Sequence, residues 1–191
     1  MRNDPTGVIC LIVAVIVLLP FVWLIAIYNR IRRLQQYIRE SWGDIDVELK
    51  RRYDLIPNLV ETVKGYATHE RETLAKVIEL RNRAAASTGS PASQATDESA
   101  LMIGMKQLFA VAENYPQLKA DAQFLALQQE LANTEDRIAA ARRFFNANVR
   151  ELNQLCQTFP TSLVANMAGA QPTSYFELTS DAERVVPRVA V

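Results

Sequence analysis

A run of twenty residues without a single charge, 8–27, constrains this chain more than any other feature of its sequence. About 20 apolar residues in a helix are enough to cross the roughly 30 Å hydrocarbon core of a bilayer. A cleaved signal peptide has a shorter apolar region followed by small residues, whereas the bulky Trp23 and Tyr28 stand at this end. The run therefore predicts a transmembrane helix that is retained, preceded by a short segment, 1–7.

The positive charges on the two sides of this run are unequal. Only Arg2 precedes it, whereas several arginines follow it closely, namely Arg30, Arg32, Arg33 and Arg39. Segments rich in Arg and Lys stay on the cytoplasmic side of a membrane, and amphipathic aromatic rings favour the membrane–water boundary. We expect the N-terminus outside, the rest of the chain in the cytoplasm, and these membrane-interface residues: Trp23, Tyr28, Arg30, Arg32 and Arg33.

Beyond the run, apolar residues recur every three or four positions, which is typical of amphipathic α-helices. Prolines and a Ser/Gly/Pro-rich segment, 87–94, interrupt the pattern, and Pro57 disfavours helical geometry at the residue before it. We expect helices at about 28–54, 57–86, 96–114 and 117–159, within a helical domain at 28–160, followed by an irregular or extended tail at 161–191. Short connections between long helices favour antiparallel neighbours. The predicted fold is all-α, a transmembrane helix that continues into an antiparallel up-and-down four-helix bundle.

The predicted lengths of the first and fourth helices conflict. At 1.5 Å per residue, a helix from Tyr28 to Asp54 reaches about 40 Å, whereas 117–159 reaches about 64 Å. We therefore expect the fourth helix to bend or to extend past the level of Asp54, with Asn153 closer to the bilayer than Leu131. Asn146 and Asn153 are seven residues apart on one face, and we expect this face to meet Asn29 in a polar seam.

Three strings in the chain resemble the LemA family: YNRIRRL, DVELKRRYDLIPNLVETVKGYATHE and NYPQLKADAQFLALQQELANTEDRIAAARRFFN. The resemblance covers roughly residues 28–165, and LIPNLVETVKGYA is its most specific part. It implies a bacterial membrane protein with one amino-terminal span and a cytoplasmic helical bundle, and it implies no established reaction. The expected location is the bacterial inner membrane, as a single-pass protein.

Charged residues interrupt the apolar stripes of the second and fourth helices. Glu70 and Arg81 lie in line with the first stripe, and Glu135 and Arg142 occupy the second at matching spacing. One interpretation is a ligand or proton site in the bundle core, where such sites are usually built. The other is a structural polar layer that fixes helix register, because an unpaired buried charge is too costly to keep. We favour the structural layer. Lys50, Arg51 and Arg52 are expected to interact with the carboxyl end of the first helix.

Composition excludes several classes of function. The 21 Lys and Arg residues balance 21 Asp and Glu residues, which gives no basic surface of the kind that nucleic acids select. The chain has one histidine, His69, and lacks the Glu-x-x-His pairs of di-iron bundles. No phosphate-binding glycine loop occurs. We therefore predict no catalytic residue, no metal, no cofactor and no nucleic acid as partner.

Two functional hypotheses remain. The first is a membrane-anchored, non-enzymatic scaffold or adaptor that associates with itself or with other membrane or envelope proteins. The alternative is a helical bundle that binds a small ligand or a redox group through its core Glu and Arg residues. Absorbance and metal analysis of the purified protein distinguish the second hypothesis from the first, and cross-linking in membranes detects partners.

Overall fold

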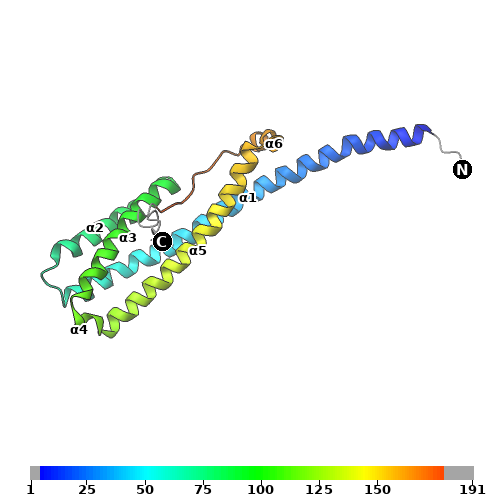
Figure 1. Ribbon diagram of the computed structural model, residues 1–191. Coiled ribbons are helices and arrows are strands. Elements are labelled where there is room, and N and C mark those ends of the chain that lie inside the picture. The colour runs from blue at the N-terminus through cyan, green and yellow to red at the C-terminus, as the bar shows by residue number, and fades with distance from the viewer. Residues whose placement is uncertain (1–4, 179–191) are drawn as a thin grey trace, which may run out of the picture. The chain divides into compact units, whose positions relative to one another are not determined.

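The computed structural model describes residues 5–178, which form six helices (Figure 1). They are α1 (Pro5–Lys64), α2 (Arg71–Ala86), α3 (Pro91–Glu113), α4 (Pro116–Lys119), α5 (Ala122–Gln157) and α6 (Thr161–Met167). No strand occurs in the described part of the chain, so the all-α prediction is confirmed. The predictions for residues 1–4 and for the tail at 179–191 lie outside the described residues.

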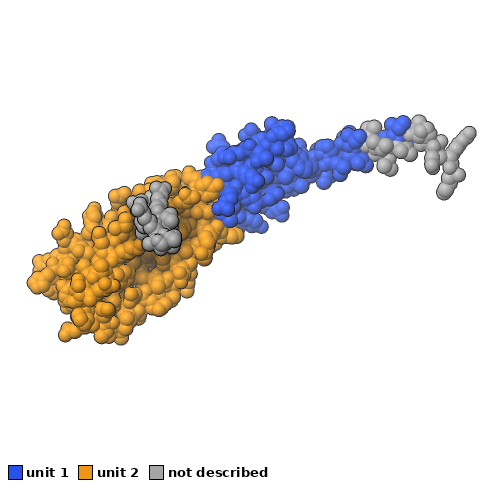
Figure 2. Space-filling model, in the orientation of Figure 1, with its two compact units in different colours: residues 1–40, 147–173 blue, residues 41–146, 174–191 orange. Residues whose placement is uncertain are grey.

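The chain divides into two compact units (Figure 2). Unit 1 comprises residues 1–40 and 147–173, and unit 2 comprises residues 41–146 and 174–191. The helices α1 and α5 each contribute residues to both units. The helices α2, α3 and α4 belong to unit 2, and α6 belongs to unit 1.

Unit 2 is an antiparallel bundle of four helical segments, from α1, α2, α3 and α5, and successive segments run in opposite directions (Figure 1). Arg52 of α1 bonds to Glu98 of α3 and to Glu135 of α5. Arg83 of α2 donates to Asp97 of α3 at 2.7 Å. The up-and-down four-helix prediction is confirmed for this unit.

The prediction that the first helix ends at Asp54 and the next begins at Pro57 was wrong, because α1 runs through Pro57 to Lys64. Proline has no backbone N–H, so it leaves the carbonyl four residues before it without its helical partner. That carbonyl belongs to Tyr53, and the Nε of Arg81 on α2 donates to it at 3.0 Å. A side chain from the neighbouring helix thus replaces the lost backbone bond.

The true break between α1 and α2 lies at residues 65–70. Gly65 follows directly after the end of α1, and α2 begins only at Arg71. The next helix also begins earlier than predicted, at Pro91 instead of residue 96. Ser90 is its N-cap, whose side chain accepts a hydrogen bond from the backbone N–H of Ser93 at 3.3 Å. Part of the Ser/Gly/Pro-rich segment is therefore a helix start and not a loop.

The predicted fourth helix, 117–159, is two helices. The short α4 ends at Lys119, and α5 begins at Ala122 after Asp121, whose Oδ1 accepts from the backbone N–H of Phe124 at 2.8 Å. The predicted conflict of lengths came from the assumed end at Asp54. From Tyr28 to Lys64, α1 measures about 56 Å, and the 36 residues of α5 measure about 54 Å.

The predicted irregular tail contains α6 and an extended segment. In unit 1, the carboxamide of Asn153 donates to the carbonyl of Thr173 at 2.9 Å and accepts from its N–H at 2.8 Å. In unit 2, Asn146 bonds in the same way to Phe176, at 3.0 and 2.9 Å. These asparagines bind the backbone of the tail, so the predicted seam with Asn29 was wrong.

Unit 1 has an apolar core built from α1, the end of α5 and α6. Its buried residues are Ile31, Leu34, Leu152, Leu155, Val164, Ala165, Ala168 and Ala170. Leu24, Ile27 and Tyr28 of α1 pack against this core and remain partly exposed. The core of unit 1 therefore begins at the last turn of the apolar run.

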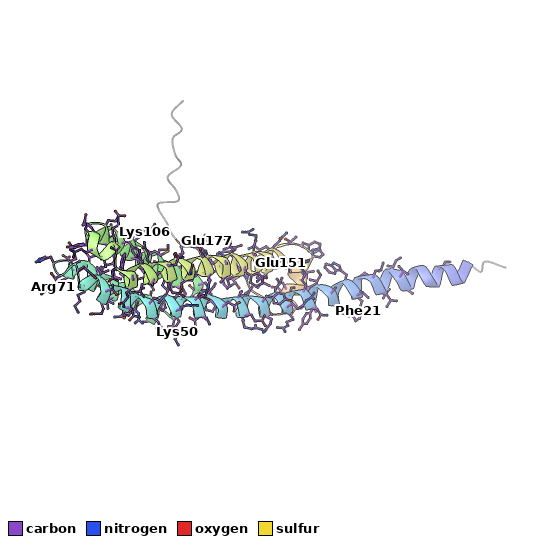
Figure 3. All side chains as sticks on the ribbon, turned by 90° about the horizontal axis from the view of Figure 1, so that it is seen from below. Phe21, Lys50, Arg71, Lys106, Glu151 and Glu177 are labelled. Carbon is purple, nitrogen blue, oxygen red and sulfur yellow. The ribbon has the colours of Figure 1, made fainter. Side chains whose placement is uncertain are left out.

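The apolar run itself has little cover within the protein. The helix that contains it is long and apolar enough to cross a membrane, and its most apolar stretch is almost entirely exposed. Phe21 projects from α1 with no other element beside it (Figure 3). Exposed Val, Leu, Ile and Phe side chains over several turns are expected of a helix whose solvent is lipid.

Candidate functional site

A buried polar cluster lies in the core of unit 2, and Arg52 is at its centre. The Arg52 side chain is 1% exposed and the Glu98 side chain is 0% exposed, and the two form an ion pair. The Nη1 of Arg52 also donates to Oε2 of Glu135 at 2.7 Å, and the Glu135 side chain is 36% exposed. The cluster therefore joins α1, α3 and α5.

Two further side chains complete the bonding around Glu98. The Tyr53 hydroxyl donates to Oε1 of Glu98. The Nε2 of Gln94 lies 3.0 Å from the same carboxylate oxygen, 3.1 Å from the Tyr53 hydroxyl and 3.1 Å from the carbonyl oxygen of Ala84. Because Gln94 also reaches Ala84, the cluster contacts all four helical segments of the bundle.

The electrostatics of the cluster follow from its burial. Burial, and then the hydrogen bond to Glu98, raises the pKa of Tyr53 well above its ordinary range, so its hydroxyl stays a donor. An arginine is effectively always charged, and it compensates the charge of the Glu98 carboxylate in the dry interior. Tyr53 and Gln94 then supply the hydrogen bonds that a buried carboxylate requires.

A third carboxylate borders the cluster. Glu48 is four residues before Arg52 and hence on the same side of α1. Its Oε1 lies 3.9 Å from Nη1 of Arg137, whereas its Oε2 is buried without a hydrogen-bond partner among the described residues. The Nε of Arg52 is also buried and unpartnered in this part of the chain.

The structure places the four predicted polar-layer residues differently from one another. Glu135 belongs to the cluster, and Arg81 contacts the Tyr53 carbonyl next to it and lies 3.9 Å from Asp54. Glu70 is the N-cap of α2 and forms no side-chain cap bond. Arg142 is half-buried on α5 and forms no hydrogen bond or ion pair with the described residues of the cluster. The layer thus forms around Arg52 and not around Glu70 and Arg142.

Arg52 was wrongly predicted to lie at the end of a helix. Since α1 continues for twelve residues beyond it, no carboxyl end is near, and the side chain points into the bundle. Its neighbour Arg51 pairs instead with the half-exposed Glu130. The sequence did indicate that Arg52 is buried. Position 52 lies three residues after Leu49 and four before Ile56, so it continues the apolar stripe that begins at Ile45.

Gln94 and Glu98 were also missed from the sequence. Gln94 fell in the segment interpreted as a loop, and Glu98 in the first turn of a helix predicted to start at residue 96. With α3 beginning at Pro91, these residues lie one turn apart and in line with Leu101, which is fully buried. Recognition of Ser90–Pro91 as a helix start would have placed both on the buried face.

This arrangement is suited to holding helices together. Both oxygens of Glu98 accept hydrogen bonds from side chains of unit 2, so each oxygen already has a partner within the bundle. No group of three or more His, Cys, Asp or Glu side chains in the described part of the chain is placed to hold a metal ion. The geometry matches a buried ion pair that specifies helix register.

The predicted membrane-interface residues lie together on α1 in unit 1. Arg32 donates to the Tyr28 hydroxyl at 3.1 and 3.2 Å and stacks over its ring, with 5.3 Å from Cζ to the ring centroid. Arg30 pairs with Glu151 of α5 at 2.8 Å. Arg33 is exposed, and Trp23 is partly exposed. Their contact with a bilayer stays a prediction.

Comparison with known proteins identifies relatives over most of the chain. The chain is 28% identical to Protein LemA of Metamycoplasma hominis, in a match that covers 82% of this chain and 71% of that protein. It is 22% identical to the magnetosome protein MamQ of Magnetospirillum gryphiswaldense, over 78% of this chain and 64% of that protein. The sequence model of the LemA family matches residues 41–190. The chain is therefore a member of the LemA family, a conclusion that agrees with the resemblance seen in its sequence.

Proposed function

We propose that this protein is a membrane-anchored, non-enzymatic scaffold, which associates with itself or with other membrane or envelope proteins through its helical bundle. The observation that carries the proposal is the continuity of α1. One helix of 60 residues supplies both the exposed apolar run and a quarter of the bundle in unit 2. The same helix therefore contributes both to the proposed anchor and to the bundle.

The buried polar cluster supports a structural role over a catalytic one. Its charged groups bond to one another, and an ion pair of this kind is best suited to fixing which helices meet. Neither relative carries the name of a reaction: one is named Protein LemA and the other is named for the magnetosome. A scaffold whose surfaces carry the function is consistent with both names.

Several exposed apolar side chains on unit 2 are candidates for protein contact. They come from three helices and are Val47, Ile103, Leu125 and Phe144. Binding of a partner removes exposed aromatic and aliphatic side chains from water, and this lowers the free energy of the complex. We expect a partner, or a second copy, to cover at least one of these positions in the membrane.

Photo-cross-linking in native membranes tests the scaffold proposal. A photoreactive amino acid is placed at Val47 or at Phe144 in the full chain, and Lys76, an exposed charged position on α2, is the control. We expect discrete cross-linked protein bands from at least one apolar position and none from Lys76. A purified chain that carries a stoichiometric metal, chromophore or small molecule, and that gives no cross-link, would support the ligand-binding alternative and contradict the scaffold.

We also propose that the bundle faces the cytoplasm, on the strength of the arginines that follow the apolar run. A single cysteine at Thr88, in the exposed α2–α3 loop, tests this in a chain with Cys10 and Cys156 replaced by alanine. A membrane-impermeant maleimide should label it only after the cells are permeabilised. Labelling of unpermeabilised cells whose outer layer has been removed would mean that the bundle faces outward.

A further inference from the structure

A stretch of 25 residues near the end of the described chain contains no charge. Between Glu151 and Glu177 there is no Lys, Arg, Asp or Glu, although such residues make up 22% of the whole chain. The apolar run at 8–27 is the other long uncharged stretch. Several of its apolar residues are buried, but its exposed positions also carry no charge, which is unusual for the surface of a soluble protein.

The structure brings part of this stretch to the last turn of the apolar run. In unit 1, α6 buries Val164, Ala165 and Ala168 in the core that also includes Ile31 of α1. Leu24 and Ile27, the final residues of the apolar run, pack against the same core. Leu24 is about 9 Å along the helix axis from Arg30, where charged residues begin. The helix α6 is therefore held beside the point where α1 passes from apolar to charged.

The outer side of this region is apolar and exposed. Leu163 and Met167 are four residues apart on α6, hence on one face, and they lie opposite the buried residues. Phe159, just before the helix, is the most exposed large apolar residue of the described chain. Three large apolar side chains in water have an unfavourable hydration free energy that burial would remove.

We infer that α6 and Phe159 form a second membrane contact, with Phe159, Leu163 and Met167 inserted into the headgroup and upper acyl region of the leaflet from which α1 emerges. This inference rests on α1 spanning the bilayer, as proposed above. Interfacial helices bury their apolar face about 5–10 Å into this region, and α6 shares its core with Leu24 and Ile27, the last turn of the apolar run. The missing charge is consistent with lipid as the neighbour, because a charged side chain at that depth is costly.

Fluorescence quenching in vesicles tests this contact. The full chain, with Cys10 and Cys156 replaced by alanine, carries one environment-sensitive label on a cysteine and is reconstituted with phosphatidylcholine and phosphatidylglycerol in equal parts. The test position is Leu163, and the matched control is Ile103 of unit 2, since both are 57% exposed. Leu18 in the apolar run, 58% exposed, is the positive control for the span. Quenchers are lipids spin-labelled near the top or near the end of the acyl chain, and iodide in the water.

We expect the label at Leu163 to be quenched several-fold more by shallow spin-labelled lipid than the label at Ile103, and less by iodide. Equal behaviour at the two positions overturns the contact. A label at Leu163 shielded from both lipid and iodide means that a protein or a second copy covers α6, which also overturns it. A label at Leu18 that deep lipid does not quench overturns the transmembrane span itself.

A pair of charged variants separates lipid contact from folding. With the label moved to Phe159, Leu163→Glu together with Met167→Glu should reduce lipid quenching several-fold while the thermal unfolding midpoint stays unchanged, because both side chains are exposed. Gln171→Glu adds a charge at another exposed position and should leave the quenching as it is. Unchanged quenching in the double variant overturns the contact.

Discussion

The cores of the two units differ in kind, although α1 and α5 contribute to both. Unit 2 buries a charged pair, Arg52 and Glu98, and bonds it to side chains from other helices. The core of unit 1 consists of aliphatic residues and alanines, and its ion pair, Arg30 with Glu151, is half-exposed. The same two helices thus use a polar core in one unit and an apolar core in the other.

The difference is explained by what each core must specify. Four helices of similar length and pattern can pack in several registers, and a buried ion pair with one satisfied arrangement disfavours the others. Among the described residues, unit 1 buries no charged side chain. Small side chains such as Ala165 and Ala168 instead allow α6 to pack closely.

The largest effect should come from breaking the buried pair. Glu98→Ala removes the fully buried partner of Arg52 and leaves only the partly exposed Glu135, so we expect a loss of about 3–5 kcal/mol in the free energy of unfolding. The control is Glu151→Ala, which removes the exposed partner of Arg30 and should cost about 1 kcal/mol or less. Chemical denaturation of the full chain in detergent, followed by circular dichroism, measures both. Equal losses would mean that the contrast between the cores is absent.

Glu135→Ala sharpens the same comparison. Its side chain is partly exposed, and Arg52 keeps Glu98 as a partner in this variant. We therefore expect a loss between those of the two variants above, on the order of 1–2 kcal/mol. A loss as large as that of Glu98→Ala would show that Arg52 depends on Glu135 as much as on Glu98.

Two phenylalanines provide the next comparison. Phe176 is fully buried in unit 2, with its ring centroid 5.5 Å from that of Trp42, whereas Phe159 of unit 1 is 78% exposed. Phe176→Ala should cost about 3 kcal/mol or more in detergent solution, because it leaves a cavity. Phe159→Ala should change the free energy of unfolding by about 0.5 kcal/mol or less. A small effect at Phe176 would mean that the tail is not part of the core.

A smaller effect tests the proline in α1. Arg81→Met removes the donor to the Tyr53 carbonyl and should cost about 1 kcal/mol. In a Pro57→Ala background, the restored N–H can bond to that carbonyl, so the same change should cost less. A double-mutant cycle on unfolding free energies measures the coupling between the two positions. Additive effects would show that Arg81 acts elsewhere, for example on Asp54, 3.9 Å away.

The smallest effect concerns pH. The backbone N–H of Phe124, and then the Tyr66 hydroxyl at 2.9 Å, lower the pKa of Asp121 below its ordinary value of about 3.9. A carboxyl with a lowered pKa in the folded state stabilises the fold above its unfolded pKa, and this contribution is lost as the pH falls through the folded value. Asp121→Asn should therefore flatten the decline in the unfolding midpoint below about pH 4. An unchanged acid slope would contradict this role.

The sequence predicted the features that depend on local pattern. Apolar periodicity identified the helical segments, and the buried Ile138 and Phe145 lie seven residues apart along α5, in line with this periodicity. These positions follow from spacing along one helix, so no knowledge of the neighbouring helices was needed.

The missed features depend on partners distant in sequence. Pro57 was interpreted by a local rule, and only the position of Arg81 shows why the helix continues. Arg52 was assigned to the carboxyl end of a helix, whereas its compensating acid, Glu98, is 46 residues away in the sequence. The bonds of Asn146 to the backbone of Phe176 likewise join residues 30 positions apart. No pattern within one helix indicates these pairs.

The position of Phe176 in the core of unit 2 has a consequence for biosynthesis. Its ring packs against Trp42, from the early part of the chain, and Phe145 lies 5.4 Å from Trp42 in the same group. Domains fold as their residues leave the ribosome, starting from the N-terminal side, and contacts between distant residues form late. The apolar run is therefore made, and ready to enter a membrane, long before Phe176 exists.

During that interval the aromatic surface of Trp42 and Phe145 has no covering residue from the tail. A nascent chain that stalls before residue 176 would keep this surface exposed beside a membrane that already holds its anchor. The aromatic group of unit 2 is therefore completed only after residue 176 has been synthesised.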